Sequence, residues 1–227
     1  MPIARTLDYD FFKTWSSSMG YVLGYFAADG SMLENNRGAY FIEFTSIDRI
    51  LLEHVQLATD SNHAITPRER GGNTKTSYRL QIGSREWFQD LTDLGFTQNK
   101  SNTLQFPEIP SKYFGDFVRG YFDGDGCAYF KQNWAKDRGK ERWVFRTLFT
   151  SGSYEFLFQL HRRLKISGVK GGHISSKSKG AYDLVFSAHD SLALYRLMYH
   201  TAQDANLFLP RKREKLEQAI QVLGLEK

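Results

Sequence analysis

The sequence predicts an α+β fold built from two pseudo-symmetric repeats, each with the element order αββαββα. The first observation is a repeated segment: VLGYFAADG at residues 22–30 returns as VRGYFDGDG at residues 118–126, with six of nine positions identical. The second is an alternation of apolar and polar residues in strand-like segments, and the third is a set of apolar stripes at helical spacing. We therefore expect an N-terminal repeat at residues 1–103 and a C-terminal repeat at residues 104–227, each with a four-stranded antiparallel sheet.

Each repeat is expected to open with a helix that ends in Asp-Gly. Ser17 or Ser18 can cap the first of these helices, and Ser111 follows Pro110 at the start of the second. A hairpin comes next, with its second strand at residues 40–45 or 143–150, and the second copy carries a longer excursion at residues 131–142. The remaining elements are expected at residues 50–58, 65–70, 77–83 and 85–94 in the first repeat and at residues 156–164, 173–177, 181–187 and 191–199 in the second. A basic helix at residues 210–223 is appended to the second repeat.

The predicted strands leave one polar sheet face without a helix to cover it. Within residues 77–83, apolar side chains point to one face while Ser77, Arg79 and Gln81 point to the other. Solvation is the plain interpretation of such a face, but here it is rich in long donors that suit guanine edges and phosphates, and a β-ribbon fits the major groove. The candidate DNA-binding residues are Arg37, Arg68, Arg70, Lys75, Arg79, Gln81, Lys131, Arg142, Arg146, Lys177 and Lys179.

Composition narrows the class of protein. The chain has 30 Lys and Arg against 25 Asp and Glu, so it is basic and is attracted to a polyanion such as DNA. The lone Cys127 excludes an intramolecular disulfide and a cysteine-cluster zinc site, and it fits a reducing compartment. Because neither a membrane-spanning run nor a signal peptide is visible, we expect an intracellular protein of the cytoplasm, nucleoid or an organelle matrix, neither secreted nor bound to a membrane.

Small residues predict that the two Asp-Gly helices pack closely. Gly20, Gly24 and Ala28 fall four residues apart, so one face of the first helix carries almost no side chain. Gly120 and Gly124 do the same on the second helix. Two such faces let helix backbones approach each other.

Close packing would bring Asp29 and Asp125, at the ends of these helices, near each other. Two carboxylates at short range repel, and one of them is protonated unless a cation lies between them. Carboxylates together with waters and phosphate oxygens form the ligand set that Mg²⁺ prefers. Such ions can activate a water and stabilise the leaving oxygen of an in-line phosphodiester displacement. The two-fold arrangement would supply one carboxylate-centred site for each strand of a duplex.

The two nine-residue segments resemble the LAGLIDADG signature of homing endonucleases, and the repeat length resembles the single-chain members that carry two motifs. The resemblance implies a monomer whose two sheets form a saddle over a long, pseudo-palindromic duplex DNA site. It also implies cleavage of one phosphodiester in each strand with a divalent metal, leaving short 3′ overhangs. Mg²⁺ is the expected cofactor, and Mn²⁺ or Ca²⁺ would substitute for it in binding.

Site residues follow from the same resemblance. Asp29 and Asp125 match the catalytic metal ligands, and the carbonyls of Ala28 and Gly124 would help to coordinate the metal. Lys100 and Lys212 resemble an active-site lysine that positions water or balances charge on the phosphate. Glu43 matches a polar residue near the end of the second strand, and Gly20, Gly24 and Gly120 fall on the helix interface.

Two positions depart from the family pattern. Leu148 stands where the second copy should repeat Glu43, which puts the equivalence of the two half-sites in doubt. Ala27 stands where the second copy has Asp123, but this first acidic position is not the metal ligand.

Other functions remain open. An RNA-binding intron maturase on the same fold would have host intron RNA as its partner. A catalytically silent DNA-binding regulator would be expected to lose Asp29 or Asp125, and both are present. An α+β protein with no nucleic-acid role leaves the repeat and the basic sheet faces unexplained.

Overall fold

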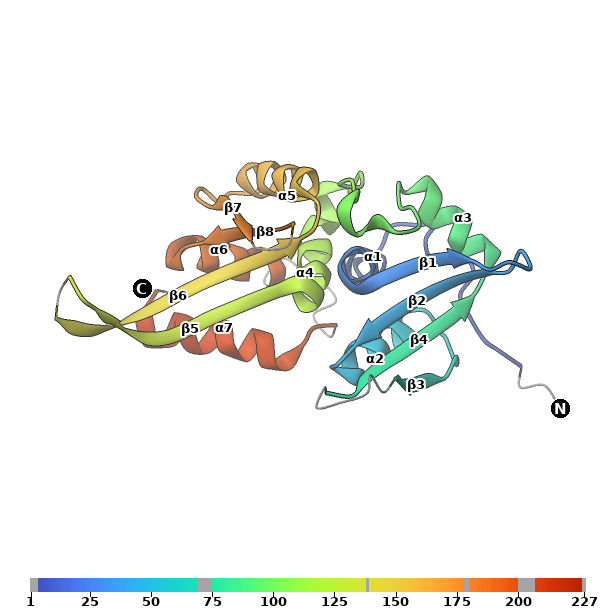
Figure 1. Ribbon diagram of the computed structural model, residues 1–227, viewed down its shortest axis with the longest axis horizontal. Coiled ribbons are helices and arrows are strands. Elements are labelled where there is room, and N and C mark those ends of the chain that lie inside the picture. Colours follow the sequence, from blue (N-terminus) through green and yellow to red (C-terminus); the bar gives the residue numbers. More distant parts are fainter. Residues whose placement is uncertain (1–3, 69–74, 138, 178–179, 200–206, 226–227) are drawn as a thin grey trace.

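The computed structural model describes residues 4–68, 75–137, 139–177, 180–199 and 207–225, which form an α+β fold with two four-stranded antiparallel sheets (Figure 1). The first repeat contains α1 (Ser17–Asp29), β1 (Gly30–Glu34), β2 (Tyr40–Ser46), α2 (Arg49–Ala58), β3 (Ile65–Arg68), β4 (Ser77–Gly83) and α3 (Arg85–Asp93). The second contains α4 (Phe114–Asp125), β5 (Gly126–Ala135), β6 (Lys140–Ser151), α5 (Tyr154–Ile166), β7 (His173–Lys177), β8 (Ala181–Phe186) and α6 (Ala188–Tyr199), followed by α7 (Pro210–Leu223). The 3₁₀ turns η1 (Lys100–Asn102) and η2 (Ser111–Tyr113) lie between them. The predicted order αββαββα is confirmed in both halves, while the boundary at residue 103 stays a prediction.

The two sheets have the same topology and the same register. Their strand orders are β1-β2-β4-β3 and β5-β6-β8-β7. Gly30 pairs with Phe44 in the first sheet, and Gly126 pairs with Phe149 in the second. The internal repeat of the sequence is therefore a repeat of structure down to individual strand pairs.

Three local predictions need correction. Ser16, rather than Ser17 or Ser18, caps α1, because its hydroxyl oxygen accepts from the Met19 N–H at 3.0 Å. Ser111 opens the turn η2, and α4 begins three residues later. The excursion expected at residues 131–142 is mostly strand, since β5 and β6 stay paired as far as Ala135 and Lys140.

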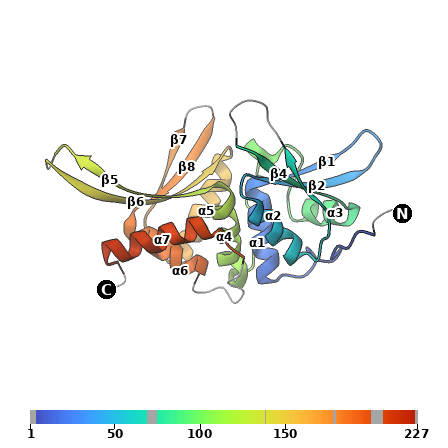
Figure 2. The ribbon, with the colours of Figure 1, turned by 90° about the horizontal axis from the view of Figure 1, so that it is seen from below.

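The sheets and the helices occupy opposite sides of the molecule. Figure 2 shows both sheets above the helices, with the β1–β2 and β5–β6 hairpins at opposite ends and curving away from the helical side. Side chains on the helical side of the strands, such as Phe44 and Phe149, are fully buried. The opposite face of each sheet, called the open face below, carries no helix in this view. Among the described residues, no helix is long and apolar enough to cross a membrane.

The helices α1 and α4 pack backbone to backbone at the centre of the molecule. A Cβ atom added to Gly24 would lie 2.0 Å from the carbonyl oxygen of Phe117. A Cβ added to Gly120 would lie 2.0 Å from the carbonyl oxygen of Tyr21. These two contacts are equivalent by the repeat, so the predicted interface of small residues is present and pseudo-symmetric. Gly20 has more room, with the Tyr113 carbonyl oxygen 3.1 Å from its hypothetical Cβ.

A buried arginine joins the end of the second repeat to α4. Arg119 is 1% exposed, and its guanidinium donates to the carbonyl oxygens of Leu207 and Met198 and to the Asp116 carboxylate. A charged group at this depth is tolerated because its hydrogen bonds and its ion pair replace water. Arg119 therefore holds Met198, near the end of α6, and Leu207, before α7, against α4.

The glycine contacts predict a large loss of stability when either central glycine gains a methyl group. Gly24→Ala and Gly120→Ala should each lower the free energy of unfolding by about 2–4 kcal/mol, because a backbone carbonyl must move to admit the Cβ. Gly83→Ala is the matched control, since the nearest atom would lie 3.7 Å from its Cβ. Urea denaturation measures the three variants. Equal changes in the urea concentration at the unfolding midpoint for all three would contradict this packing.

Candidate active site and nucleic-acid interface

The candidate centre lies where α1 and α4 end side by side. Asp29 and Asp125 are the last helical residues, and each is followed at once by the first residue of a strand. A Cβ added to Gly124 would lie 2.4 Å from the Ala28 Cβ and 3.1 Å from an Asp29 carboxylate oxygen. The carboxylate of one motif helix therefore lies against the last turn of the other.

The surroundings oppose negative charge on both carboxylates. Burial raises the pKa of Asp29 to about 6, despite the nearby charges of Lys212 and Lys100. Burial raises the pKa of Asp125 to about 7, and repulsion from Asp29 adds to the increase. The C-terminal ends of two helices point at the same place, and their dipoles also disfavour anions there. The predicted convergence of the two carboxylates is thus supported by their electrostatics.

Two buried lysines cap the motif helices. Lys100 donates to the Ala27 carbonyl oxygen at 3.0 Å, and its ammonium lies 5.4 Å from the centre of the Phe26 ring. Lys212 donates to the carbonyl oxygens of Phe122, Asp123 and Gly124 at 2.7, 2.7 and 3.0 Å.

Both ammonium groups sit in the field of the two carboxylates. Burial lowers the pKa of Lys100 and Lys212 to about 8. The attraction of Asp125 and Asp29 limits this decrease for both lysines, and for Lys212 the attraction of Asp123 is larger still. An ammonium has three donors. Lys212 uses all three on helix carbonyls, so it would act on a phosphate through its charge, whereas Lys100 keeps donors for a direct contact.

Two tyrosines and one aspartate hold the centre in place, and the sequence reasoning did not find these roles. The hydroxyl of Tyr25 donates to the Thr45 carbonyl oxygen at 3.4 Å, and that of Tyr121 donates to the Thr150 carbonyl oxygen at 2.7 Å. These equivalent contacts tie each motif helix to the strand beside its aspartate. Their signal was available, because both tyrosines are identical positions of the repeated segment.

Asp123 is buried beside the centre and serves the structure. Its carboxylate accepts from the Tyr21 hydroxyl at 2.9 Å and from the Leu209 N–H at 2.8 Å. It thereby anchors the residue that precedes α7, the helix that carries Lys212. This position is Ala27 in the first repeat, which has no carboxylate to make the equivalent contacts.

Glu43 lies on the open face of the first sheet and is engaged by its neighbours there. Its carboxylate accepts from Gln81 at 2.7 Å and from Arg79 at 3.4 Å. The register confirms that Leu148 is its counterpart, because Ser31 pairs with Glu43 as Cys127 pairs with Leu148. The acidic neighbour that raises the pKa of Asp29 is Asp48, not Glu43, so a role of Glu43 at the reacting phosphate stays a prediction.

Most candidate DNA-binding side chains share the open faces. Cross-strand partners in an antiparallel sheet project to the same face. By the register of the strands, the described candidates on these faces are Arg68, Arg79, Gln81, Lys131, Arg142, Arg146 and Lys177. Arg37 lies in the β1–β2 turn and Lys75 just before β4, both exposed. Arg70 and Lys179 lie outside the described residues.

The open faces differ next to the centre. In the first sheet Thr45 pairs with Arg79, and the equivalent Thr150 of the second sheet pairs with Asp183. The Thr150 hydroxyl donates to the Asp183 carboxylate at 2.6 Å, and Lys177 pairs with the same carboxylate. This charge reversal depends on which strands pair and has no local signal in the sequence.

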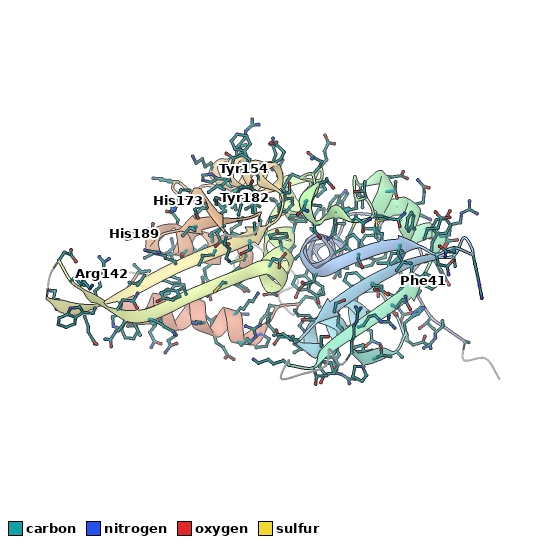
Figure 3. All side chains as sticks on the ribbon, in the orientation of Figure 1. Phe41, Arg142, Tyr154, His173, Tyr182 and His189 are labelled. Carbon is teal, nitrogen blue, oxygen red and sulfur yellow. The ribbon has the colours of Figure 1, made fainter. Side chains whose placement is uncertain are left out.

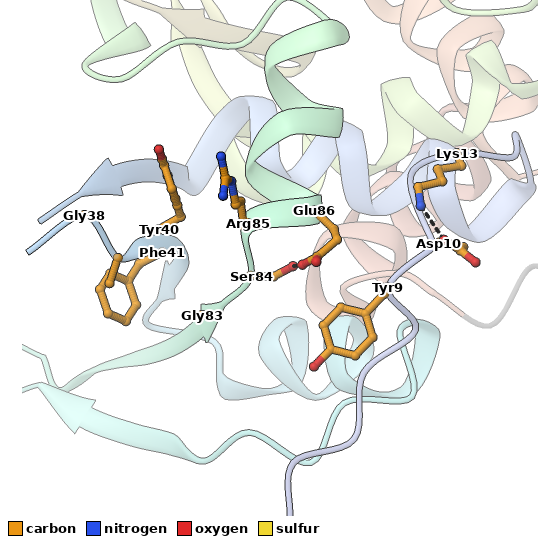
Figure 4. A pocket seen from close by; sticks show the side chains of 11 residues that line it. Tyr9, Asp10, Lys13, Gly38, Tyr40, Phe41, Gly83, Ser84, Arg85 and Glu86 are labelled. Carbon is orange, nitrogen blue, oxygen red and sulfur yellow. Dashed lines mark hydrogen bonds and ion pairs between the residues drawn. The ribbon is translucent and has the colours of Figure 1, made fainter.

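A cavity of about 330 Å³ opens beside Asp29. It is lined by Asp29, Thr45, Ser46, Ile47, Asp48, Ser77, Asp123, Gly124 and Arg211. A larger cavity of about 680 Å³ at the outer end of the first sheet, lined by Tyr9, Tyr40 and Arg85 among others (Figure 4), shares no residue with it. The cavity that touches a motif aspartate is therefore the candidate site for a reacting group.

The donor set of the centre consists of oxygen atoms. Within the described part of the chain, no group of three or more His, Cys, Asp or Glu side chains could enclose a metal. A cation held here would therefore use the two carboxylates, helix carbonyls and atoms from water or substrate. Ala28 offers a carbonyl for this purpose, while that of Gly124 already accepts from Lys212. This set fits Mg²⁺, which keeps waters and binds through one or two carboxylates and substrate phosphates.

The raised pKa values predict that the metal-free protein gains stability when either aspartate becomes asparagine. The folded state binds more protons than the unfolded state between pH 4 and about 7, so the free energy of unfolding falls as pH rises through this range. Asp29→Asn or Asp125→Asn should raise it by about 1–2 kcal/mol at pH 7 and change it little at pH 4, since one pKa unit corresponds to about 1.4 kcal/mol before solvent screening. Urea denaturation in EDTA measures this, with Glu141→Gln as an exposed control. Equal pH slopes for the wild type and both Asn variants would contradict the electrostatics of the centre.

Comparison with known proteins agrees with this arrangement. Residues 16–94, the first repeat from the Ser16 cap to the end of α3, match the LAGLIDADG-like domain family. No curated protein matches the chain. The matching segment includes Asp29 and the β1–β4 sheet.

Solved structures extend the likeness to the whole chain. A crystal structure of the meganuclease I-SmaMI bound to uncleaveable DNA aligns with a TM-score of 0.61 at 13% identity, covering 91% of this chain and 92% of that chain. The LAGLIDADG meganuclease I-AabMI bound to uncleaved DNA gives a TM-score of 0.59 at 12% identity, covering 91% and 90%. The LAGLIDADG homing endonuclease I-LtrWI bound to target DNA gives 0.58 at 11% identity, covering 96% and 91%. Residues 16–94 are thus similar to a LAGLIDADG-like domain, and the chain has the fold of the single-chain LAGLIDADG meganucleases.

Proposed function

We propose that the protein is a site-specific homing endonuclease that cuts both strands of a long, pseudo-palindromic duplex DNA site with a divalent metal. The observation that carries this proposal is the pair Asp29 and Asp125. These residues end two helices that pack against each other, and each is followed by the first strand of a sheet. Duplex DNA has two antiparallel strands related by two-fold axes, so two pseudo-symmetric carboxylates can serve one phosphodiester each. Such cuts across the minor groove would leave short 3′ overhangs.

The chain's residues divide the work of binding and reacting. The basic side chains of the open faces, including Arg79 and Arg146, would contact phosphates and base edges along the major groove. Lys100 and Lys212, mostly protonated at pH 7, would lower the energy of negative charge on the phosphate. Tyr25 and Tyr121 would hold the strand ends in place beside the carboxylates.

A divalent cation would resolve the repulsion in the centre. Asp29 and Asp125 would hold it together with the Ala28 carbonyl, and Mg²⁺ fits these oxygen donors. Bound there, the cation supplies activation of a water and stabilisation of the leaving oxygen. Mn²⁺ or Ca²⁺ would take its place in binding.

The proposal predicts metal-dependent cutting that needs both aspartates. On a randomised duplex library with Mg²⁺, the purified protein should give recurrent double-strand cuts with short 3′ overhangs. Asp29→Asn and Asp125→Asn should each lower the cleavage rate by about 1,000-fold or more while duplex binding persists. Asp60→Asn, on an exposed turn with φ of 47°, is the matched control.

The outcomes separate the alternatives. Specific duplex binding without cutting in Mg²⁺ or Mn²⁺ would contradict the nuclease proposal and favour a DNA-binding regulator. Tight binding of a structured intron RNA without duplex cutting would favour a maturase.

The DNA-binding surface is longer on the C-terminal side. Strands β5 and β6 contain 10 and 12 residues, against 5 and 7 in β1 and β2. Figure 3 places Arg142 near the outer end of the β5–β6 hairpin. Five further residues per strand extend this hairpin by about 16 Å. Lys131, Asn133 and Arg142 lie on its open face.

This length predicts an asymmetric footprint. At ~3.4 Å per base pair, the C-terminal half-site should be protected about five base pairs farther from the centre than the N-terminal one. Arg142→Ala should remove protection at the outer end of the C-terminal half-site, weaken binding and lower the slope of log affinity against log salt by about one. Arg37→Ala, on the shorter hairpin, should instead remove protection at the outer end of the N-terminal half-site. Hydroxyl-radical footprinting in Ca²⁺ measures both. Protection of equal length on both sides would contradict the asymmetry.

A further inference from the structure

An ion pair between the two repeats lies beside Asp29. Arg211, the second residue of α7, donates from Nε to one Asp48 carboxylate oxygen at 3.0 Å and from a terminal nitrogen to the other at 2.5 Å. Both residues line the cavity that contains Asp29. The Arg211 side chain is nevertheless 56% exposed, and Asp48 uses two of its five N–H donors.

Asp48 has an uncharged counterpart in the second repeat. The Asp48 N–H donates to the Ser46 hydroxyl oxygen at 3.0 Å, and the Ser153 N–H donates to the Ser151 hydroxyl oxygen at 3.1 Å. Ser46 and Ser151 each end the second strand of their sheet, so Ser153 occupies the place of Asp48. Ser153 is buried and donates to the Leu104 carbonyl oxygen.

Arg211 also has an uncharged counterpart. Lys100 and Lys212 cap equivalent ends of the two motif helices, so the residue before each lysine is equivalent as well. The residue before Lys100 is Asn99, which is exposed with φ of 58°. The bidentate pair beside Asp29 therefore corresponds to a neutral serine and a neutral asparagine beside Asp125.

We propose that Arg211, oriented by Asp48, binds a backbone phosphate of only one DNA strand, so the two strands are held and cut inequivalently. The inference rests on the proposed nuclease function. A guanidinium with three remaining donors suits a phosphate, and Lys212 beside it has spent its own donors on helix carbonyls. On the Asp125 side, the amide of Asn99 supplies no positive charge.

Strand-resolved cleavage tests the proposal. On the selected target with each strand labelled separately, Arg211→Ala should slow one strand by about 10- to 100-fold and leave the other within about threefold. A supercoiled plasmid carrying the target should then accumulate as nicked circle. Arg211→Lys should recover part of the lost rate, and Asn99→Gly, which tolerates the φ of 58° at this position, should change neither strand.

A second variant separates phosphate contact from a mere clamp between repeats. Asp48→Asn removes the ion pair but keeps Arg211, so it should slow the affected strand much less than Arg211→Ala does. If Asp48→Asn and Arg211→Ala lower both strand rates and the melting temperature equally, the pair is only a clamp and the proposal is wrong.

Binding separates this inference from the proposed function. If the wild type cuts no duplex, the nuclease proposal fails, but the phosphate contact is still measurable. Arg211→Ala should then lower the slope of log affinity against log salt for duplex DNA by about one. An unchanged slope would overturn the contact whether or not the wild type cuts.

Discussion

The backbone contact between α1 and α4 is the constraint on which the rest of the structure depends. Gly24 and Gly120 each face a carbonyl of the other helix with no space for a side chain. The helices can therefore run together to their last residues, which are Asp29 and Asp125. Because β1 and β5 begin at the next residue, the same contact fixes both sheets relative to the carboxylates.

The meeting of these helix ends concentrates negative charge, and two buried lysines compensate it. Two helix dipoles and two carboxylates point at one region, which is unfavourable in a poorly solvated place. Lys100 and Lys212 bring compensating charge at the cost of their own burial, and their pKa values fall as a result. The pKa values of the two aspartates are raised and those of the two lysines are lowered, as is typical of a site that binds a charged ligand. Burying these four charged groups lowers the stability of the ligand-free protein, which is a common cost of a functional site.

Much of the fold could be predicted because the sequence contains two copies of the same structural unit. The repeat gave the element order, the alternation gave the strand faces, and small residues at spacing four gave the helix contact. The proximity of Asp29 and Asp125 followed from the same spacing, and their expected role as metal ligands from the resemblance to the LAGLIDADG signature. Ser16 was missed because three serines in a row offer equivalent caps, and only backbone geometry selects one of them.

The ion pair of Asp48 with Arg211 and the contacts of Arg119 could not be predicted, since none of the partners carries a local signal. Asp48 and Arg211 are 163 residues apart, and each would pass as a solvated charge on a helix. Arg119 interrupts the apolar pattern of a motif helix, and the carbonyls that accept from it belong to the end of α6 and the approach to α7. Such partners can be identified only once the fold has brought these distant segments together.

The two copies differ on the open faces of their sheets and are alike where the motif helices contact each other. The glycines, tyrosines and aspartates of the motif helices are shared because each is held by its counterpart or by the strand beside it. On the open faces no such reciprocity applies. The second row from the centre, next to the rows of Thr45 and Thr150, has Glu43 and Gln81 in the first sheet but Leu148 and Val185 in the second. Polar side chains can read base edges by hydrogen bonds, whereas aliphatic ones can contact only features such as the thymine methyl group. Under the proposed function, a perfectly palindromic duplex would therefore match one half of this surface and not the other, so the recognised site should depart from symmetry near its centre.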